Sequence, residues 1–141
     1  MKPDPVAEGR LWLAQAERDL ASAMDLSEHG HYNVACFQCQ QAIEKALKAF
    51  LYYRGAREVR GHSVAELCHD ATTVDASFSE LRPVVLPADQ YYLSTRYPNG
   101  LAYGSLPYEA YDAEDATKAI RMARQALEFI RDRLQKTESG P

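Results

Sequence analysis

The sequence lacks long apolar runs and the short motifs of common enzymes. It contains no stretch of about 18 apolar residues, the length that suggests a membrane-spanning helix. No apolar segment follows the N-terminal residues Met1–Pro5, so we expect no signal peptide. Glycine-rich phosphate loops, HExxH, G-x-S-x-G and paired-carboxylate motifs are absent as well. The sequence therefore predicts a cytoplasmic protein with no cofactor, and it favours a role other than catalysis.

Cysteine is also scarce, with three residues in the chain. Cys36 and Cys39 have the C-x-x-C spacing of redox proteins, but they fall inside a predicted helix and the sequence shows no strands. We therefore interpret them as reduced core residues. A metal site would need two more ligands, and His29, His31 and the Cys68–His69 pair fit no standard zinc spacing. The sequence predicts no metal site.

The composition suits one globular domain. The chain has 141 residues, of which 46% are hydrophobic and 26% charged, enough for a single core. We expect the domain to span residues 6–136, with flexible termini at 1–5 and 137–141. The net charge of −4 argues against a protein that binds nucleic acid through overall charge. The segment from Glu44 to Arg60 contains five basic and two acidic residues. This local positive charge suits either a bound phosphate or a solvated helix end.

Apolar residues at three- and four-residue steps predict three long helices and therefore an all-α fold. The first two span about 6–29 and 32–53, and Gly30 and Gly55 end them. The short loop between them predicts an antiparallel hairpin. The third begins after Asp112 and carries a regular apolar stripe: Ala113, Ala116, Ile120, Ala123, Leu127, Ile130 and Leu134.

Shorter elements are expected between the second and third long helices. Ser63 and Glu66 form a capping-box pattern that predicts a helix to about Thr72. The remaining expectations are a helical turn at 78–82, a break bracketed by Pro83 and Pro87, a helix at 88–95 ended by Pro98–Gly100, and an ordered loop at 101–111. The sequence thus predicts two or so short helices in addition to the three long ones.

A row of polar side chains runs along the second helix, although that helix is apolar over most of its circumference. The row contains Gln38, Gln41, Glu44, Lys45 and Lys48. A helix of this kind should be central in the fold, where unpaired polar groups are costly. The row is therefore either a structural network or a surface that binds a ligand or partner.

Two further patterns contain candidate functional residues. Arg57 and His62 are spaced as R-x4-H, and an arginine beside a histidine can cleave RNA without a metal; alternatively, His62 only precedes the Ser63 cap. Arg96 lies among six tyrosines, at positions 91, 92, 97, 103, 108 and 111. Such rings can stack on a base, pack against a partner helix or hold a loop to the core.

Several motifs in order resemble the HEPN family (higher eukaryotes and prokaryotes nucleotide-binding domain), over roughly residues 8 to 135. They are Trp12-x-x-x-Ala16-x-x-Asp19-Leu20, Gly30-x-Tyr32-x-x-Ala35-x-Phe37-x-x-Gln40-Gln41-Ala42-x-Glu44-Lys45-x-x-Lys48-Ala49, His62-Ser63, Arg96-Tyr97-Pro98 and Tyr111-Asp112-Ala113. The resemblance implies an up-and-down helical bundle that forms a homodimer. It also implies a minimal nucleotidyltransferase partner in a toxin–antitoxin-type pair.

Some family members bind nucleotides and others are RNases with an R-x4-6-H motif. Here the resemblance makes Arg96 the arginine of that motif. The histidine would then fall at Leu101, Ala102 or Tyr103, and none of these is histidine. This departure argues against RNase activity.

The leading interpretation is a homodimer that binds a nucleotide or its nucleotidyltransferase partner. In it Lys45 and Lys48 contact phosphate, Arg96 joins them, and Tyr92 or Tyr97 stacks on the base. One alternative is a metal-independent endoribonuclease toxin that uses His62 with Arg96 or Arg57. Another is a non-catalytic interaction module whose polar row is satisfied by Asp19 and its neighbours. The stripe of the last helix and the tyrosine-rich loop are both candidate dimer surfaces.

Overall fold

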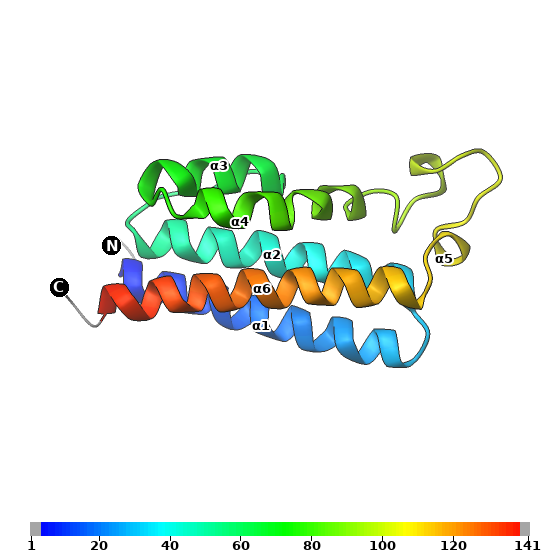
Figure 1. The fold of residues 1–141 in the computed structure, drawn as a ribbon, viewed down its shortest axis with the longest axis horizontal. Helices are drawn as coiled ribbons and strands as arrows, with labels where there is room; N and C mark the ends of the chain where they lie inside the picture. Colours follow the sequence, from blue (N-terminus) through cyan, green and yellow to red (C-terminus); the bar gives the residue numbers. More distant parts are fainter. Residues whose placement is uncertain (1–3, 139–141) are drawn as a thin grey trace.

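The structure begins with a helical hairpin. It is a computed structural model that describes residues 4–138. Helices α1 (Pro5–Glu28) and α2 (Tyr32–Tyr53) lie antiparallel (Figure 1). Asp4 caps α1, and Gly30 follows it with φ 82°, so both helices lie within one residue of their predicted bounds. Gly9 allows close approach, because a Cβ there would lie 2.8 Å from Cβ of Tyr53.

The third long helix, α6 (Ala113–Glu138), packs along α2 and α1. A capping box starts it: the Asp115 backbone N–H donates to the Asp112 carboxylate, and the Asp112 N–H donates to Asp115, both at 2.9 Å. The contact faces of α2 and α6 are rich in fully buried alanines, which permit close helix approach: Ala42, Ala46, Ala49, Ala116 and Ala123. The predicted stripe of α6 is thus largely core.

Two short helices follow: α3 (Val64–Val74) packs against α2, and α4 (Phe78–Val85) packs against α3 and α6 (Figure 1). Phe78 joins them to the core, because its ring contacts Phe50 at 4.3 Å and Phe129 at 4.9 Å between centroids. Ser63 caps α3 as predicted, accepting from the Glu66 N–H. The all-α bundle of three long helices and shorter ones is therefore confirmed.

The segment between α4 and α6 differs from the prediction. Helix α4 continues through Pro83 and passes directly into the 3-10 helix η1 (Leu86–Tyr91), so the predicted break is wrong. Proline inside a helix removes one hydrogen bond, and here the buried face of α4 outweighs that loss. Turns replace the predicted helix after Tyr91. The short helices η2 (Pro98–Gly100) and α5 (Pro107–Ala110) then lie on a segment that projects past the end of the bundle (Figure 1).

The ends of the chain and its cysteines complete the fold. Pro5 and residues 137–138, which we expected in flexible termini, are helical, and Asp4 is the cap of α1. Residues 1–3 and 139–141 of those expected termini lie outside the described residues. Cys36 and Cys39 are free and buried, which confirms their interpretation as core residues. Burial raises the pKa of Cys36 to about 12 and also raises that of Cys39. Across residues 4–138, no helix is long and apolar enough to span a membrane.

Candidate ligand-binding site

The polar row of α2 is paired with α1 at Lys45. Nζ of Lys45 lies 2.6 Å from Oδ2 of Asp19, whose other oxygen accepts a hydrogen bond from Gln15 at 2.9 Å. The Asp19 side chain is 10% exposed and that of Lys45 24%. We expected the Lys45 ammonium to face a ligand; it instead forms a largely buried ion pair between the two helices.

One turn further along α2, Lys48 is buried as well. Its Nζ lies 3.7 Å from Oε2 of Glu44 and 5.5 Å from the ring centroid of Trp12. The side chains of Lys48 and Glu44 are 7% and 3% exposed. The Lys48 ammonium therefore lies between a buried carboxylate and an aromatic face, and it would have to leave both to meet the phosphate expected from the sequence.

The second oxygen of Glu44 orients His62, which precedes α3. Oε1 of Glu44 lies 3.1 Å from Nδ1 of His62. A carboxylate oxygen accepts from an N–H group, so this contact fits the tautomer that carries its proton on Nδ1 and leaves Nε2 of a neutral ring as an acceptor. Gln40 fixes the backbone here by donating to the His62 carbonyl at 3.1 Å, and Gln41 donates to Gln40. The His62 side chain stays 61% exposed.

His62 connects this network to an exposed aromatic surface. Its ring stacks on Tyr92, with centroids 5.5 Å apart and planes 19° apart. The Arg96 guanidinium lies over the same ring at 4.8 Å and also over Phe37 at 4.2 Å and Tyr97 at 5.0 Å. Arg96 also donates two hydrogen bonds to the Tyr92 carbonyl, at 2.9 and 2.6 Å. We call Phe37, Tyr92, Arg96 and Tyr97 the Arg96 platform.

The turn that carries Tyr92, Arg96 and Tyr97 of the platform is anchored on both sides. Asn33 of α2 donates to the carbonyl of Thr95 at 3.0 Å, and Thr95 is fully buried. The Ser94 hydroxyl is hydrogen-bonded to the Tyr111 hydroxyl just before α6. Arg96 is therefore held in place by tertiary contacts, while its own side chain remains exposed.

The other candidate residues are not joined to this site. Arg57 is exposed, and within residues 4–138 it forms no ion pair, hydrogen bond or ring contact, with His62 or any other residue. The tyrosine cluster is divided: Tyr91 is buried in the core, whereas Tyr103 and Tyr108 are highly exposed. Burial raises the pKa of Tyr91 to about 12, which suits a structural ring.

Sequence reasoning missed Asp89, which fixes the start of α3 next to His62. Its carboxylate accepts from the backbone N–H groups of Val64 at 2.7 Å and Ala65 at 3.1 Å, and from the Ser63 hydroxyl at 3.2 Å. An acidic side chain is favourable at a helix N-terminus, but this one comes from η1, about two dozen positions along the chain. No local pattern could have indicated it.

Comparison with known proteins identifies the family. A model of the HEPN domain matches residues 10–133. The chain belongs to the HEPN family. A solved HEPN homologue, the archaeal protein ST0689, is 33% identical with a TM-score of 0.74, over 90% of this chain and 98% of that one.

Two bacterial structures are similar as well. The protein TT1696 from Thermus thermophilus is 34% identical, with a TM-score of 0.80 over 89% of this chain and 97% of that one. The HEPN domain protein TM0613 from Thermotoga maritima is 29% identical, with a TM-score of 0.68 over 88% and 97%. A Methanocaldococcus jannaschii protein with the name "Putative toxin MJ1304" is 31% identical over an alignment 135 residues long, and the match covers 89% of this HEPN chain and 88% of the relative.

Proposed function

We propose that this HEPN protein is the toxin-type member of a toxin–antitoxin pair and binds a nucleotide or a minimal nucleotidyltransferase partner at the Arg96 platform. The observation that carries this proposal is the exposed guanidinium of Arg96 beside the rings of Phe37, Tyr92 and Tyr97. A guanidinium suits a phosphate, and an exposed ring suits a base. The name of the relative MJ1304 supports the toxin part of the proposal.

The lysines of α2 have unequal roles in this proposal. Lys45 is partly exposed and can turn from Asp19 toward a phosphate, whereas Lys48 would first have to leave a buried ion pair. Breaking a buried pair costs about 3–5 kcal/mol, which is a large share of the binding energy of a small ligand. Ligand contact is therefore assigned to Arg96, Tyr92, Tyr97 and Lys45.

The nucleotide part is tested by calorimetric titration of the purified protein with ATP and GTP. Heat that saturates in the wild type and in Arg57→Ala, and is lost in Arg96→Ala, would support the platform. No heat at millimolar nucleotide would contradict it.

If Lys48→Ala and Arg96→Ala lower the melting temperature and no ligand or partner binding changes, the chain is a non-catalytic interaction module.

The segment between η1 and α6, residues 92–112, is the proposed homodimer surface. The apolar stripe of α6, the other candidate, is largely buried against the chain's own core. The segment instead carries exposed apolar side chains: Leu93, Tyr97, Tyr103, Leu106 and Tyr108. Exposed apolar groups gathered on one segment are typical of an interaction surface.

The dimer is tested by light scattering on the wild type and on Tyr103→Ser/Tyr108→Ser. A dimeric wild type and a monomeric variant with unchanged circular dichroism would support the surface. A monomeric wild type would contradict it. Co-purification with the nucleotidyltransferase of the neighbouring gene, if one is present there, tests the partner.

A metal-independent endoribonuclease is the second candidate function. One observation favours it: His62 and Arg96 contact the same ring of Tyr92, and Glu44 holds Nδ1 of His62, so Nε2 can act as a base. Total RNA is incubated in EDTA with the wild type and His62→Ala. Cleavage by the wild type alone would support an RNase, and equal background cleavage by both would end the idea.

A further inference from the structure

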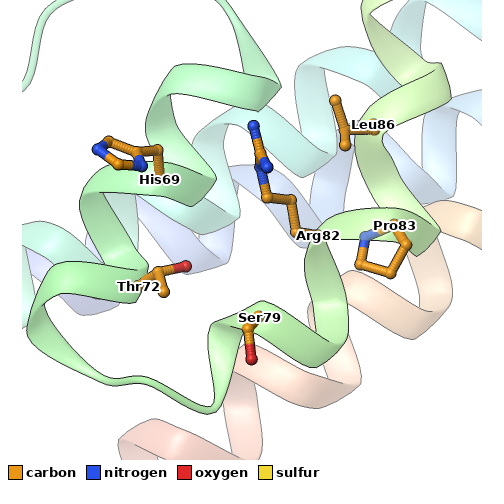
Figure 2. Close-up of a pocket in the computed structure, with 6 residues that line it drawn as sticks. All are labelled: His69, Thr72, Ser79, Arg82, Pro83 and Leu86. Carbon is orange, nitrogen blue, oxygen red and sulfur yellow. The ribbon is translucent and has the colours of Figure 1, made fainter.

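A hollow between α3 and α4 lies apart from the Arg96 platform. It has a volume of about 300 Å³, at the lower end of the range for small-molecule sites. Figure 2 shows the six residues that line it: His69 and Thr72 from α3, Ser79, Arg82 and Pro83 from α4, and Leu86 just after α4. None of these side chains is acidic.

Two side chains of the hollow, Arg82 and His69, can donate hydrogen bonds to a ligand. Arg82 extends from α4 alongside α3, and His69 lies at the rim (Figure 2). Within residues 4–138, neither side chain forms an ion pair, a hydrogen bond or a ring contact. Glu66 and Asp70 line an adjoining hollow that shares His69 and Arg82. The acid-free hollow is therefore the one suited to an anion.

The same hollow also offers hydrogen-bond acceptors. The Thr72 hydroxyl donates its proton to the Cys68 carbonyl at 2.8 Å, so its oxygen can only accept from a ligand. Pro83 has no N–H, so the carbonyl of Ser79, four residues earlier, lacks its usual helical donor. Pro83 and Leu86 supply apolar surface beside these groups.

We propose that this hollow binds a small phosphate monoester that carries hydroxyl groups, of the sugar phosphate class. Its phosphate contacts Arg82 and His69, and its hydroxyls donate to Thr72 and to the Ser79 carbonyl. Its carbon skeleton packs on Pro83 and Leu86. Arginine and imidazole alone would hold any phosphate; the two acceptors and the apolar wall select for the attached sugar.

The test is an NMR titration of the full chain with ribose 5-phosphate, with inorganic phosphate as the comparison. We expect amide shifts concentrated within residues 69–86 and about tenfold tighter binding of ribose 5-phosphate, since two added hydrogen bonds contribute that much. Equal affinity for the two ligands would overturn the assignment to a sugar phosphate. Shifts spread over all exposed basic residues would overturn the site itself.

Two variants separate the parts of the proposal. Arg82→Gln should weaken both ligands at least about tenfold, because it removes the charge opposite the phosphate. Thr72→Val should weaken ribose 5-phosphate and leave inorganic phosphate unchanged, because it removes one acceptor for the sugar hydroxyls without changing charge. Arg57→Gln, at an exposed arginine outside both sites, is the control and should bind like the wild type. An Arg82→Gln protein that titrates like the wild type would overturn the proposal.

Discussion

Two neighbouring groups of polar residues on and around α2 differ in what surrounds them. Asp19, Glu44, Lys45 and Lys48, which we call the closed network, are paired with one another and largely buried. The Arg96 platform lies next to it, and its guanidinium rests on aromatic faces in contact with solvent. His62 touches both groups.

The difference shows that charged residues of similar chemistry stabilise the fold where they are buried and are available to a ligand where they are exposed. A buried lysine has to keep its carboxylate, because an unpaired buried charge is very costly. An exposed arginine on aromatic rings loses little if it exchanges water for a ligand. The buried members of the closed network, Asp19, Glu44 and Lys48, should therefore govern stability, and the Arg96 platform with the partly exposed Lys45 should govern binding.

The strongest test of this comparison is Glu44→Ala. It removes the partner of Lys48 and the acceptor of His62, and leaves a buried ammonium unpaired. We expect about 3–5 kcal/mol lower free energy of unfolding, measured by urea denaturation. The matched control is Glu58→Ala, whose exposed pair with Arg60 should contribute less than about 1 kcal/mol. A similar loss of unfolding free energy in Glu44→Ala and Glu58→Ala would mean that the closed network contributes no more to stability than an exposed ion pair.

A smaller effect is expected at the other pair of the closed network. Asp19→Ala removes the acceptor of both Gln15 and Lys45, but the Lys45 ammonium can reach water. We expect a loss of about 1–3 kcal/mol, the range for a charged hydrogen-bonded group. Glu17→Ala, which breaks an exposed pair with Arg131, is the control and should change stability by less than about 1 kcal/mol. If Asp19→Ala lowers the free energy of unfolding as much as Glu44→Ala does, burial does not decide how much each ion pair contributes to stability.

A carboxylate outside both groups supplies a pH test. Hydrogen bonds from the Ser77 side chain and backbone and the nearby charge of Arg133 lower the pKa of Asp75 below its usual 3.8. The folded state therefore favours the ionised form, so this contribution is present above pH 3.8 and is lost as pH falls through the lower folded-state pKa. Asp75→Asn should cost about 1 kcal/mol at pH 7 and less at pH 3, measured by thermal unfolding. A loss that does not depend on pH would contradict the assignment.

The smallest change in stability is expected at the Arg96 platform. Arg96→Ala removes exposed contacts with three rings, worth about 0.5–1 kcal/mol. Differential scanning calorimetry should show a shift of a few degrees at most. A large drop in melting temperature would place Arg96 with the closed network and would weaken the proposal that it serves a ligand.

Much of the fold could be predicted because helical periodicity is a local property. The bounds of α1 and α2 and the start of α6 follow from apolar spacing, caps and glycines within each segment. The Glu44–Lys48 pair was likewise allowed by its four-residue spacing. The passage from α4 into η1 was missed, because packing of Phe78, Leu81 and Val85 overrides the proline signal.

The candidate site was only partly predictable, for a different reason. Its arginine and tyrosines could be named from the sequence, but the contact of His62 with Tyr92 joins residues far apart in the chain. The sequence left open whether the lysines of α2 meet a ligand or are paired within the chain, and only helix packing shows that Lys45 lies on Asp19 and Lys48 next to Trp12.

The sequence by itself determined the three long helices, the core face of each and the family, since these depend on spacing along the chain. Only the tertiary structure decided which charges are paired and which are exposed. Helix packing brings Asp19 onto Lys45, and the start of α3 brings His62 onto Glu44 and Tyr92. The physical reason is that burial, which sets the energetic cost of a charge, is a property of the packed molecule and not of any segment.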